Sequence, residues 1–486
     1  MVLNFFKEVL MERQEKKIST MTMTFMCFST LWGFGNVLNG YVYFNGVQVI
    51  IPWICMFLLY FIPYALMVGE LGSAFKHLGG GVTSWIQETS NAKLAYYAGW
   101  TYWAVHIAYI AGKGSGGLKA LSWIIFRNAD IYDNFKTIYV QLATIAILFF
   151  FCWMATRGLS PLKKLGALAG SSMFIMGILF IIMMYAAPVI NPNSAFLKQD
   201  YSFASLLPKV DKNFLSNLSI LVFAVGGIEK ISPYVNKMNG DPAKEFPKTI
   251  MLSTLMVVIS AIFGTIAMGM MFDVAEINAN FDSYAANGAY WAFQKLGEYY
   301  HVGNLFLIIY ALCNMIGQFS TLLISIDAPL RMLLEDPNAN KFIPRKLLKK
   351  NDKGAYTRGI IMVACLSGLI AVVQMFGPGA ATVMRQLTKL GGVTMPLRYL
   401  WVFVAYIALK KNRGELERGY SFIKNKGFGI FAGAWCFIIT LACCIMGMWS
   451  PDKVQMGLNI ATPAIIVILG LLLPIIRKSE DKKILA

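Results

Sequence analysis

The chain has 486 residues, of which 57% are hydrophobic, 14% aromatic and only 14% charged. So few polar side chains cannot cover this apolar mass in water, and the composition predicts a protein that lies in a lipid bilayer. The net charge of +18 would suggest nucleic-acid binding in a soluble protein. No basic stripe interleaved with exposed aromatic residues occurs along the sequence, which excludes nucleic acid as a partner.

Long apolar runs separated by polar loops follow one another along the chain. A helix needs about 20 mostly apolar residues to cross roughly 30 Å of hydrocarbon. Twelve runs meet this condition, approximately at residues 18–43, 46–70, 94–126, 137–156, 165–189, 213–236, 248–272, 303–333, 359–376, 381–410, 428–449 and 457–476. The turn-forming sequence FGPG at 376–379 separates the ninth run from the tenth. The pattern predicts an all-α integral membrane protein with 12 transmembrane helices.

Positive charge is distributed unequally between the loops. Most of the 43 Lys and Arg residues fall in loops on the same side as the N-terminus. This asymmetry predicts a multi-pass protein of the cytoplasmic membrane with both termini in the cytoplasm. Residues 1–17 lack the uninterrupted apolar core of a cleaved signal, and are expected to form either an interfacial amphipathic helix or an unstructured tail. Residues 477–486 are expected to form a cytoplasmic tail.

Residues suited to catalysis or metal binding do not cluster in the sequence. All eight cysteines fall inside predicted spans without CxxC or Cys/His spacing, and the three histidines, at 77, 106 and 301, lie far apart. No Walker motif is present, so this chain alone cannot drive transport with ATP. Neither a selectivity-filter repeat nor a charged pore ring is visible. We therefore expect a transporter in contact with membrane lipid, with no cofactor, no metal and no catalytic residues, in preference to a channel or an enzyme.

Glycines interrupt two of the predicted helices at comparable depths. The first span contains GFGN at 33–36, and the sixth contains FAVGGIE at 223–229. Interrupted helices at corresponding positions are typical of transporters built from inverted repeats, and an offset of five spans gives the two halves opposite topology. The sequence thus predicts a core at 18–410, made of repeats at 18–189 and 213–410, followed by two additional helices at 428–476.

An interrupted helix leaves backbone amide and carbonyl groups that must find partners within the membrane. Such groups are tolerated only where they line a cavity or are buried in protein. An amino acid could satisfy them, because its carboxylate suits the positive end of a half-helix and its ammonium suits the negative end. The alternative is that these glycines only let neighbouring helices pack closely.

Motifs dispersed over nearly the full length resemble the amino acid–polyamine–organocation superfamily of transporters. They are FAVGGIE with DPAKEFPK at 241–248, ELGSAF at 70–75 with GGG at 79–81, APLR at 328–331 and FIP at 342–344, with Lys76 standing where proline is usual. LGALAG at 165–170 and GWTYW at 99–103 are most similar to the glutamate/γ-aminobutyrate antiporter branch. GFGNV at 33–37 also resembles the neurotransmitter:sodium symporters, but LNG at 38–40 replaces their Trp-Arg-Phe-Pro sequence.

The resemblance implies a LeuT-like fold and secondary active transport of amino acids by alternating access. The mode would be antiport or proton-coupled transport, with a sodium-coupled symporter as the alternative. It implies that the substrate is held by backbone around the interruptions, and the candidate binding residues are Gly33, Phe34, Gly35, Asn36, Phe223, Ala224, Val225, Gly226 and Gly227. Phe223 would also close over the substrate as a gate. Glu229 would link the sixth span to the first, either as a proton-sensing coupling residue or as a permanent hydrogen-bond acceptor.

One lysine lies deep in the third span, within AGKGSGG at 111–117. Several related transporters carry a lysine in the fifth span, where this chain has SSM at 171–173. An unpaired ammonium in a membrane helix is costly, so we hypothesise that Lys113 faces the cavity as a fixed cation or proton carrier. The alternative is that Lys113 snorkels to the interface or forms a structural pair. Side-chain selectivity is expected to come from the third, eighth and tenth spans.

Overall fold

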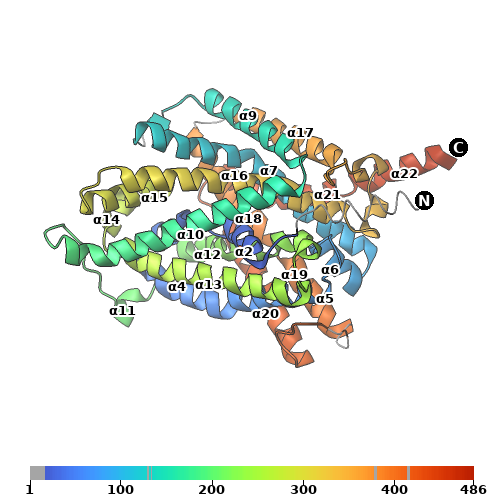
Figure 1. Cartoon of the computed structure of the whole chain (residues 1–486), viewed down its shortest axis with the longest axis horizontal. Coiled ribbons are helices and arrows are strands. Elements are labelled where there is room, and N and C mark those ends of the chain that lie inside the picture. Colours follow the sequence, from blue (N-terminus) through green and yellow to red (C-terminus); the bar gives the residue numbers. More distant parts are fainter. Residues whose placement is uncertain are drawn as a thin grey trace.

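The computed structural model describes residues 17–128, 131–132, 134–376, 380–412, 416 and 418–485, without the side chains of 380–385, 387–388 and 485. Throughout these ranges the chain is helical and forms no strand, apart from one isolated bridge between Ile18 and Met238. The long helices run roughly parallel or antiparallel to one another along the horizontal axis of Figure 1. The prediction of an all-α membrane protein is confirmed.

The helices have the following bounds in chain order. They are α2 (Thr20–Leu31), α3 (Phe34–Tyr43), η1 (Gly46–Val49), α4 (Ile50–Met56), η2 (Phe57–Phe61), α5 (Ile62–Ala74), α6 (Val82–Thr89), α7 (Ala92–Phe126), α9 (Thr137–Ala155), α10 (Leu159–Ile190), α11 (Phe203–Leu206), α12 (Lys212–Val225), η3 (Ile228–Lys237), α13 (Pro242–Gly269), α14 (Val274–Ala279), α15 (Phe281–Tyr299), α16 (Leu305–Leu334), η4 (Ala339–Phe342), η5 (Arg345–Leu348), α17 (Thr357–Gln374), α18 (Ala380–Leu397), α19 (Leu400–Asn412), α20 (Lys426–Gly447), α21 (Lys453–Leu469) and α22 (Leu472–Leu485).

Ten helical runs in the described ranges are long and apolar enough to cross a membrane, and each coincides with a predicted span. The two other predicted spans correspond to the α2–α3 pair and to the 35-residue helix α7. The chain is therefore a multi-pass membrane protein. Its two ends can be told apart in Figure 1, because α14 and α15 lie at one end of the bundle and α6 at the other.

The DPAKEFPK motif starts a membrane helix. Asp241 is the N-cap of α13 and accepts a hydrogen bond from the amide of Ala243, while Pro242 takes the first helical position. Lys76, which stands where the family usually has proline, donates to the Asp241 carboxylate over 3.1 Å. This hydrogen bond lowers the pKa of the Asp241 carboxyl group. The unusual lysine thus supports the helix start from the end of the second span.

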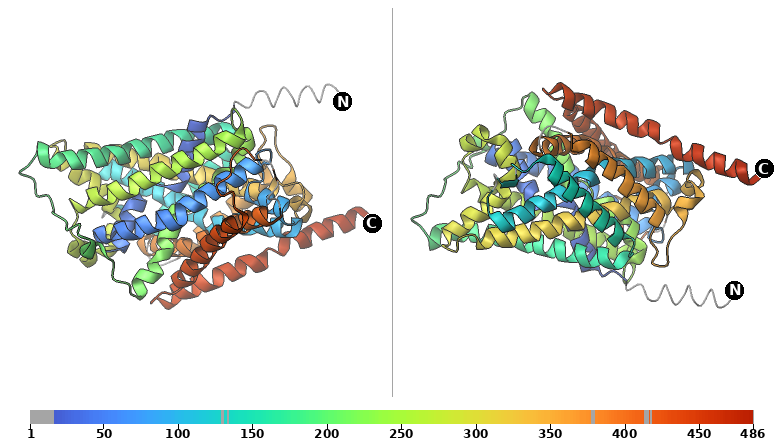
Figure 2. Two further views of the ribbon diagram at one scale, coloured as in Figure 1. Left: turned by 90° about the horizontal axis from the view of Figure 1, so that it is seen from below. Right: turned by 90° about the horizontal axis from the view of Figure 1, so that it is seen from above.

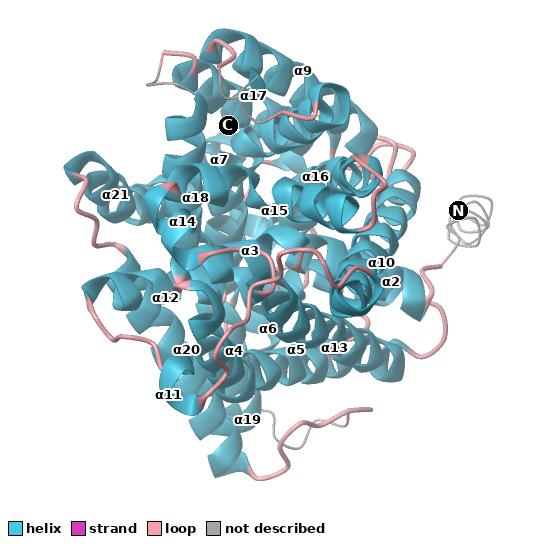
Figure 3. Ribbon diagram, turned by 90° about the vertical axis from the view of Figure 1, so that its left-hand side faces the viewer, coloured by secondary structure: helices cyan, strands magenta, loops and turns pink. Residues whose placement is uncertain are grey.

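Both predicted interruptions are present, and both are narrower than predicted. Only Trp32 and Gly33 separate α2 from α3, and only Gly226 and Gly227 separate α12 from η3. Residues 34–36 form the first turn of α3, and residues 223–225 form the last turn of α12. Gly227 has a φ of +106°, a conformation that side-chain-bearing residues rarely adopt. Figure 3, seen from the α14 end, shows α3 near the centre of the bundle.

A third interruption was not predicted. Arg398 and Tyr399 separate α18 from α19 within the tenth span. Residues 477–485, which belong to the segment predicted as a cytoplasmic tail, continue helix α22. Arg477 and Arg345 both contact Asp481 in this helix, at 3.1 and 3.0 Å. Figure 2 shows α22 extending beyond the bundle. The predicted segment 1–17 lies, except for residue 17, outside the described residues.

A buried carboxylate joins three segments at the α6 end of the bundle. Glu70 of α5 is fully buried and lies 2.5 Å from the ammonium of Lys410 and 2.8 Å from the guanidinium of Arg418. It also accepts from the backbone amide of Phe422 over 2.8 Å. Because the connection after α19 folds back onto α5 through these contacts, Glu70 fixes the relative position of α5 and α19.

Removing the carboxylate of Glu70 should destabilise the protein strongly, because two cations would lose their buried partner. We expect Glu70→Ala to cost about 3–5 kcal/mol and to lower the melting temperature of the purified protein in detergent. Lys248→Ala is the matched control, since Lys248 pairs with Glu245 in an exposed position and should change the melting temperature little. Equal melting temperatures for the two variants would contradict this role of Glu70.

Candidate functional site

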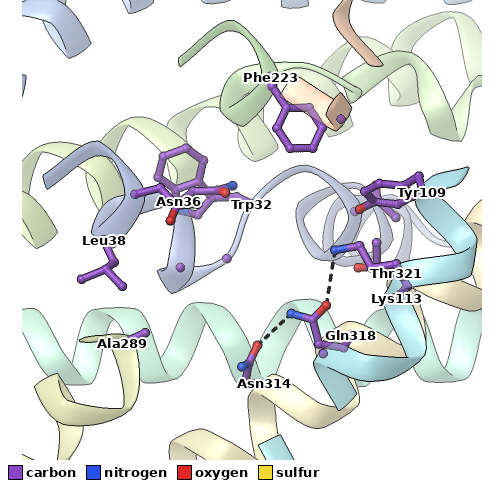
Figure 4. A pocket seen from close by; sticks show the side chains of 18 of the residues that line it. Trp32, Asn36, Leu38, Tyr109, Lys113, Phe223, Ala289, Asn314, Gln318 and Thr321 are labelled. Carbon is purple, nitrogen blue, oxygen red and sulfur yellow. Dashed lines mark hydrogen bonds between the residues drawn. The ribbon is translucent and has the colours of Figure 1, made fainter. Parts of the chain in front are cut away.

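A cavity of about 440 Å³ lies between the two predicted interruptions. Its walls come from the interruptions, from α7, α10 and α16, and from α15 at one end of the bundle. Six of the predicted site residues line it, namely Gly33, Gly35, Asn36, Lys113, Phe223 and Gly226. The sequence-predicted halves of the site are therefore brought together around one space (Figure 4).

The other predicted site residues lie behind the wall. The ring of Phe34 packs against Phe180, Phe293 and Tyr310. Ala224 and Val225 are buried in the last turn of α12, and the carbonyl of Ala224 accepts from the Asn36 side chain over 3.5 Å. This hydrogen bond joins the two interrupted helices directly. The side chains of Phe34, Ala224 and Val225 therefore support the site from behind, and only the backbone of these residues could contact a ligand.

Glu229 is the centre of a buried polar cluster. Its carboxylate accepts from the hydroxyl of Tyr64 on α5 and, over 2.5 Å, from the hydroxyl of Tyr102 on α7. Arg398 approaches the same carboxylate with its Nε at 3.6 Å. In the described part of the chain, the hydrogen bonds and the ion pair of Glu229 run to α5, α7 and the interruption of the tenth span, and the predicted link from this carboxylate to the first span is not among them, although α2 packs against η3.

Arg398 and its neighbours are functional candidates that the sequence prediction missed. The side chain of Arg398 is almost fully buried, contacts His106 of α7, and lies over the Tyr102 ring at 4.7 Å. The adjoining Tyr399 packs against Gly226, where an added Cβ would lie 2.0 Å from its ring. An arginine and a histidine inside apolar spans are unusual, and that signal could have identified both Arg398 and His106.

Two ammonium groups share one aromatic ring in the cavity wall. Lys113 of α7 and Lys230 of η3 lie 4.6 and 5.3 Å from the centre of the Tyr109 ring, where cation–π attraction stabilises them. Their hydrogen-bond partners are neutral, since Lys113 donates to Gln318 and Lys230 to Ser325, each over 3.3 Å. Within the described ranges neither lysine forms an ion pair with a carboxylate. The hydrogen-bond partners of these two lysines therefore bring no negative charge to the cavity wall.

The close-up in Figure 4 shows how these groups are arranged. Phe223 and Tyr109 lie on neighbouring parts of the wall, with ring centres 6.5 Å apart, and Lys113 points toward Gln318 of α16. Asn314 lies four residues before Gln318 on the same helix. In the part of the chain that the structure describes, no group of three or more His, Cys, Asp or Glu side chains could hold a metal ion.

Comparison with known sequences defines the class of protein. The sequence profile of the amino acid permease family matches residues 18–472, and the chain belongs to this family. The resemblance to the amino acid–polyamine–organocation superfamily is thereby confirmed, and the chain is an amino acid transport protein.

Several characterised or named relatives span nearly the same length. The chain is 43% identical to the aspartate/glutamate permease AcaP of Lactococcus lactis subsp. cremoris, over 96% of this chain and 97% of the relative. It is 25% identical to the inner membrane transporter YjeM of Salmonella typhimurium, over 88% and 89% of the two chains. It is 23% identical to the glutamate/gamma-aminobutyrate antiporter of Lactococcus lactis subsp. lactis, over 82% and 77%.

Two glycines that line the cavity, Gly226 in the sixth span and Gly35 in the first, should respond differently to an added methyl group. In Gly226→Ala the new Cβ collides with the buried Tyr399 ring, which we expect to cost about 1–3 kcal/mol and to lower the melting temperature. In Gly35→Ala the Cβ meets no atom within 4 Å, so the protein should remain as stable as the wild type. Size-exclusion profiles and melting temperatures of the two variants test this, and a stable Gly226→Ala protein would contradict the close packing of Tyr399.

Proposed function

We propose that this protein is a secondary active transporter that carries acidic amino acids across the cell membrane by alternating access, with both termini in the cytoplasm. The observation that carries the proposal is the pair of ammonium groups, Lys113 and Lys230, on the Tyr109 ring in the cavity wall, with only neutral partners. The name of the aspartate/glutamate permease to which the chain is 43% identical supports the same substrate class.

The interruptions supply sites for the groups that all amino acids share. The N-terminal end of α3, at Gly33 and Gly35, lies at the cavity and presents backbone amides there. This positive end of the helix suits the α-carboxylate of the substrate. The C-terminal end of α12, at residues 223–225, directs carbonyl groups toward the interruption, which suits the α-ammonium. Asn36, whose side chain bridges the two helices, completes this clamp.

The charge of the remaining wall selects the side chain of the substrate. An amino acid with a neutral side chain is a zwitterion and adds no net charge to the cavity. Aspartate or glutamate brings a second carboxylate, whose single negative charge would be attracted by both Lys113 and Lys230, where water is partly excluded, and would offset one of their two positive charges. Arg398 adds little to this attraction, because Glu229 lies beside its guanidinium. Lys119 and Asp282, which also line the cavity, carry opposite charges.

Phe223 and Glu229 have different roles in this proposal. The Phe223 ring lines the cavity beside Tyr109 and serves as the gate that closes over the bound substrate. Glu229 is a positioning residue, since it receives hydrogen bonds from two helices and lies beside Arg398, and so holds the segment after the interruption in place. Exchange of one amino acid for another and co-transport with protons are both compatible with this arrangement.

Transport into proteoliposomes tests the function and its coupling. Labelled aspartate and glutamate should be taken up with saturation, and excess unlabelled acidic amino acid should compete much better than neutral or basic ones. A requirement for internal substrate indicates exchange, whereas stimulation by an inward proton gradient indicates proton coupling. Strict sodium dependence, or the absence of saturable uptake of acidic amino acids, would contradict the proposal.

Removing either ammonium group should weaken the binding of acidic substrates. For Lys113→Met and for Lys230→Met we expect the KM for glutamate to rise about 10–100-fold, the effect of losing a charge-assisted hydrogen bond of roughly 1.5–3 kcal/mol. Lys248→Met, which removes an exposed lysine outside the cavity, is the control. Unchanged glutamate uptake and an unchanged pH profile in Lys113→Met would show that this lysine is no substrate ligand.

The role of Glu229 can be read from the pH profile of transport. Glu229→Gln keeps the shape of the side chain but leaves Arg398 without its charged neighbour, so the maximal rate should fall at every pH while the shape of the profile stays the same. Uptake rates measured between about pH 5 and 8 test this expectation, because proton-coupling histidine groups and buried carboxyl groups with a raised pKa change charge in this range. A flattened profile in the variant would instead assign Glu229 to proton coupling.

A further inference from the structure

A series of hydrogen-bonded neutral side chains leads from Lys113 to the end of the bundle where α15 lies. The ammonium of Lys113 donates to the Gln318 side-chain oxygen over 3.3 Å, and the Gln318 side-chain nitrogen donates to Asn314 over 3.3 Å. The Asn314 side-chain nitrogen then donates to the hydroxyl oxygen of Tyr290 over 2.8 Å. The first two of these hydrogen bonds are drawn in Figure 4.

Lys113 fixes the orientation of the two side-chain amides, Gln318 and Asn314, in this hydrogen-bonded series. An ammonium group can only donate, so Gln318 must present its carbonyl oxygen to Lys113 and its nitrogen to Asn314. Asn314 must in turn present its oxygen to Gln318 and its nitrogen to Tyr290. The acceptor that faces Lys113 is therefore a neutral carbonyl group, which leaves the positive charge of the ammonium intact.

Glycines of the third span make room for this contact. A Cβ at Gly116 would lie 3.1 Å from the Gln318 side-chain oxygen, and a Cβ at Gly117 would lie 2.2 Å from the ring of Phe319. The KGSGG sequence at 113–117 thus lets α16 approach α7 closely enough for Gln318 to reach Lys113. The motif that surrounds Lys113 is explained by this packing.

Aromatic packing holds Tyr290, the last residue of this hydrogen-bonded series. The Tyr290 ring of α15 stacks on Trp123 of α7, with centres 5.0 Å apart and planes within 10° of each other. The Trp123 indole donates to Asn287 of α15 over 3.2 Å. Because Tyr290 is fixed by these contacts, it helps to hold the orientation of Asn314 and, through Asn314, of Gln318.

We propose that Gln318 is a specificity-determining residue, which presents a neutral acceptor to Lys113 and so reserves the charge of that lysine for a substrate carboxylate. The proposal rests on the function proposed above. A carboxylate at position 318 would occupy the same place, form an ion pair with Lys113 and take over the role of the substrate's own side-chain carboxylate. The same cavity should then favour a substrate that lacks this group.

The isosteric variant Gln318→Glu tests the proposal directly in the full-length protein in proteoliposomes. Glutamate and glutamine are the probes, since they differ only in the charged group. We expect the ratio of the glutamate KM to the glutamine KM to rise at least tenfold, with saturable transport of glutamine retained. A folded Gln318→Glu protein with the wild-type ratio would overturn the proposal.

Asn314→Asp is the matched control, because it introduces the same charge at the next member of the hydrogen-bonded series, out of contact with Lys113. A smaller shift than in Gln318→Glu supports the specific contact, and an equal shift overturns it. Should Gln318→Glu fail to fold, Gln318→Met carries the test, since it adds no charge but removes the acceptor that orients the Lys113 ammonium for the substrate carboxylate. It should raise the glutamate KM and leave the glutamine KM unchanged, and an unchanged glutamate KM overturns the proposal. Failure of the wild type to transport glutamate would instead refute the proposed function.

Discussion

The contact between Arg398 and Glu229 is the interaction on which the rest of the site depends. The sixth span loses its regular helical hydrogen bonds at Gly226 and Gly227, and the segment that follows must be held by other contacts. Glu229 provides several of these contacts through Tyr64, Tyr102 and Arg398. Because Arg398 itself lies at an interruption of the tenth span, two irregular segments stabilise one another through this pair.

The same pair decides which charges remain available to a ligand. Arg398 has a carboxylate beside it, whereas Lys113 and Lys230 have only a carbonyl oxygen, a hydroxyl group and the face of Tyr109. A buried charge without a counter-ion is costly in a membrane protein and usually has a functional reason. The cost of keeping two such groups in one wall is the physical basis for proposing an anionic side chain on the substrate.

The sequence was sufficient to predict the spans and the location of two interruptions, since both depend on local patterns of apolar residues and glycine. It overestimated the length of the interruptions, because residues 34–36 and 223–225 keep helical geometry on either side of the glycines. Lys230 adjoins Glu229 in sequence but donates to Ser325, while Arg398 comes from a helix far along the chain. Choices of partner of this kind depend on tertiary packing and cannot be read from spacing.

The position of the Tyr109 ring has a mechanical consequence. Lys113 lies in the predicted repeat at 18–189 and Lys230 in the predicted repeat at 213–410, and both ammonium groups lie over this ring. In transporters with inverted repeats, one set of helices rocks against the other around a fixed site. A carboxylate bound by both lysines would connect the parts that move and would release them when it leaves. Occupancy of the site and the relative position of the two repeats would then be coupled.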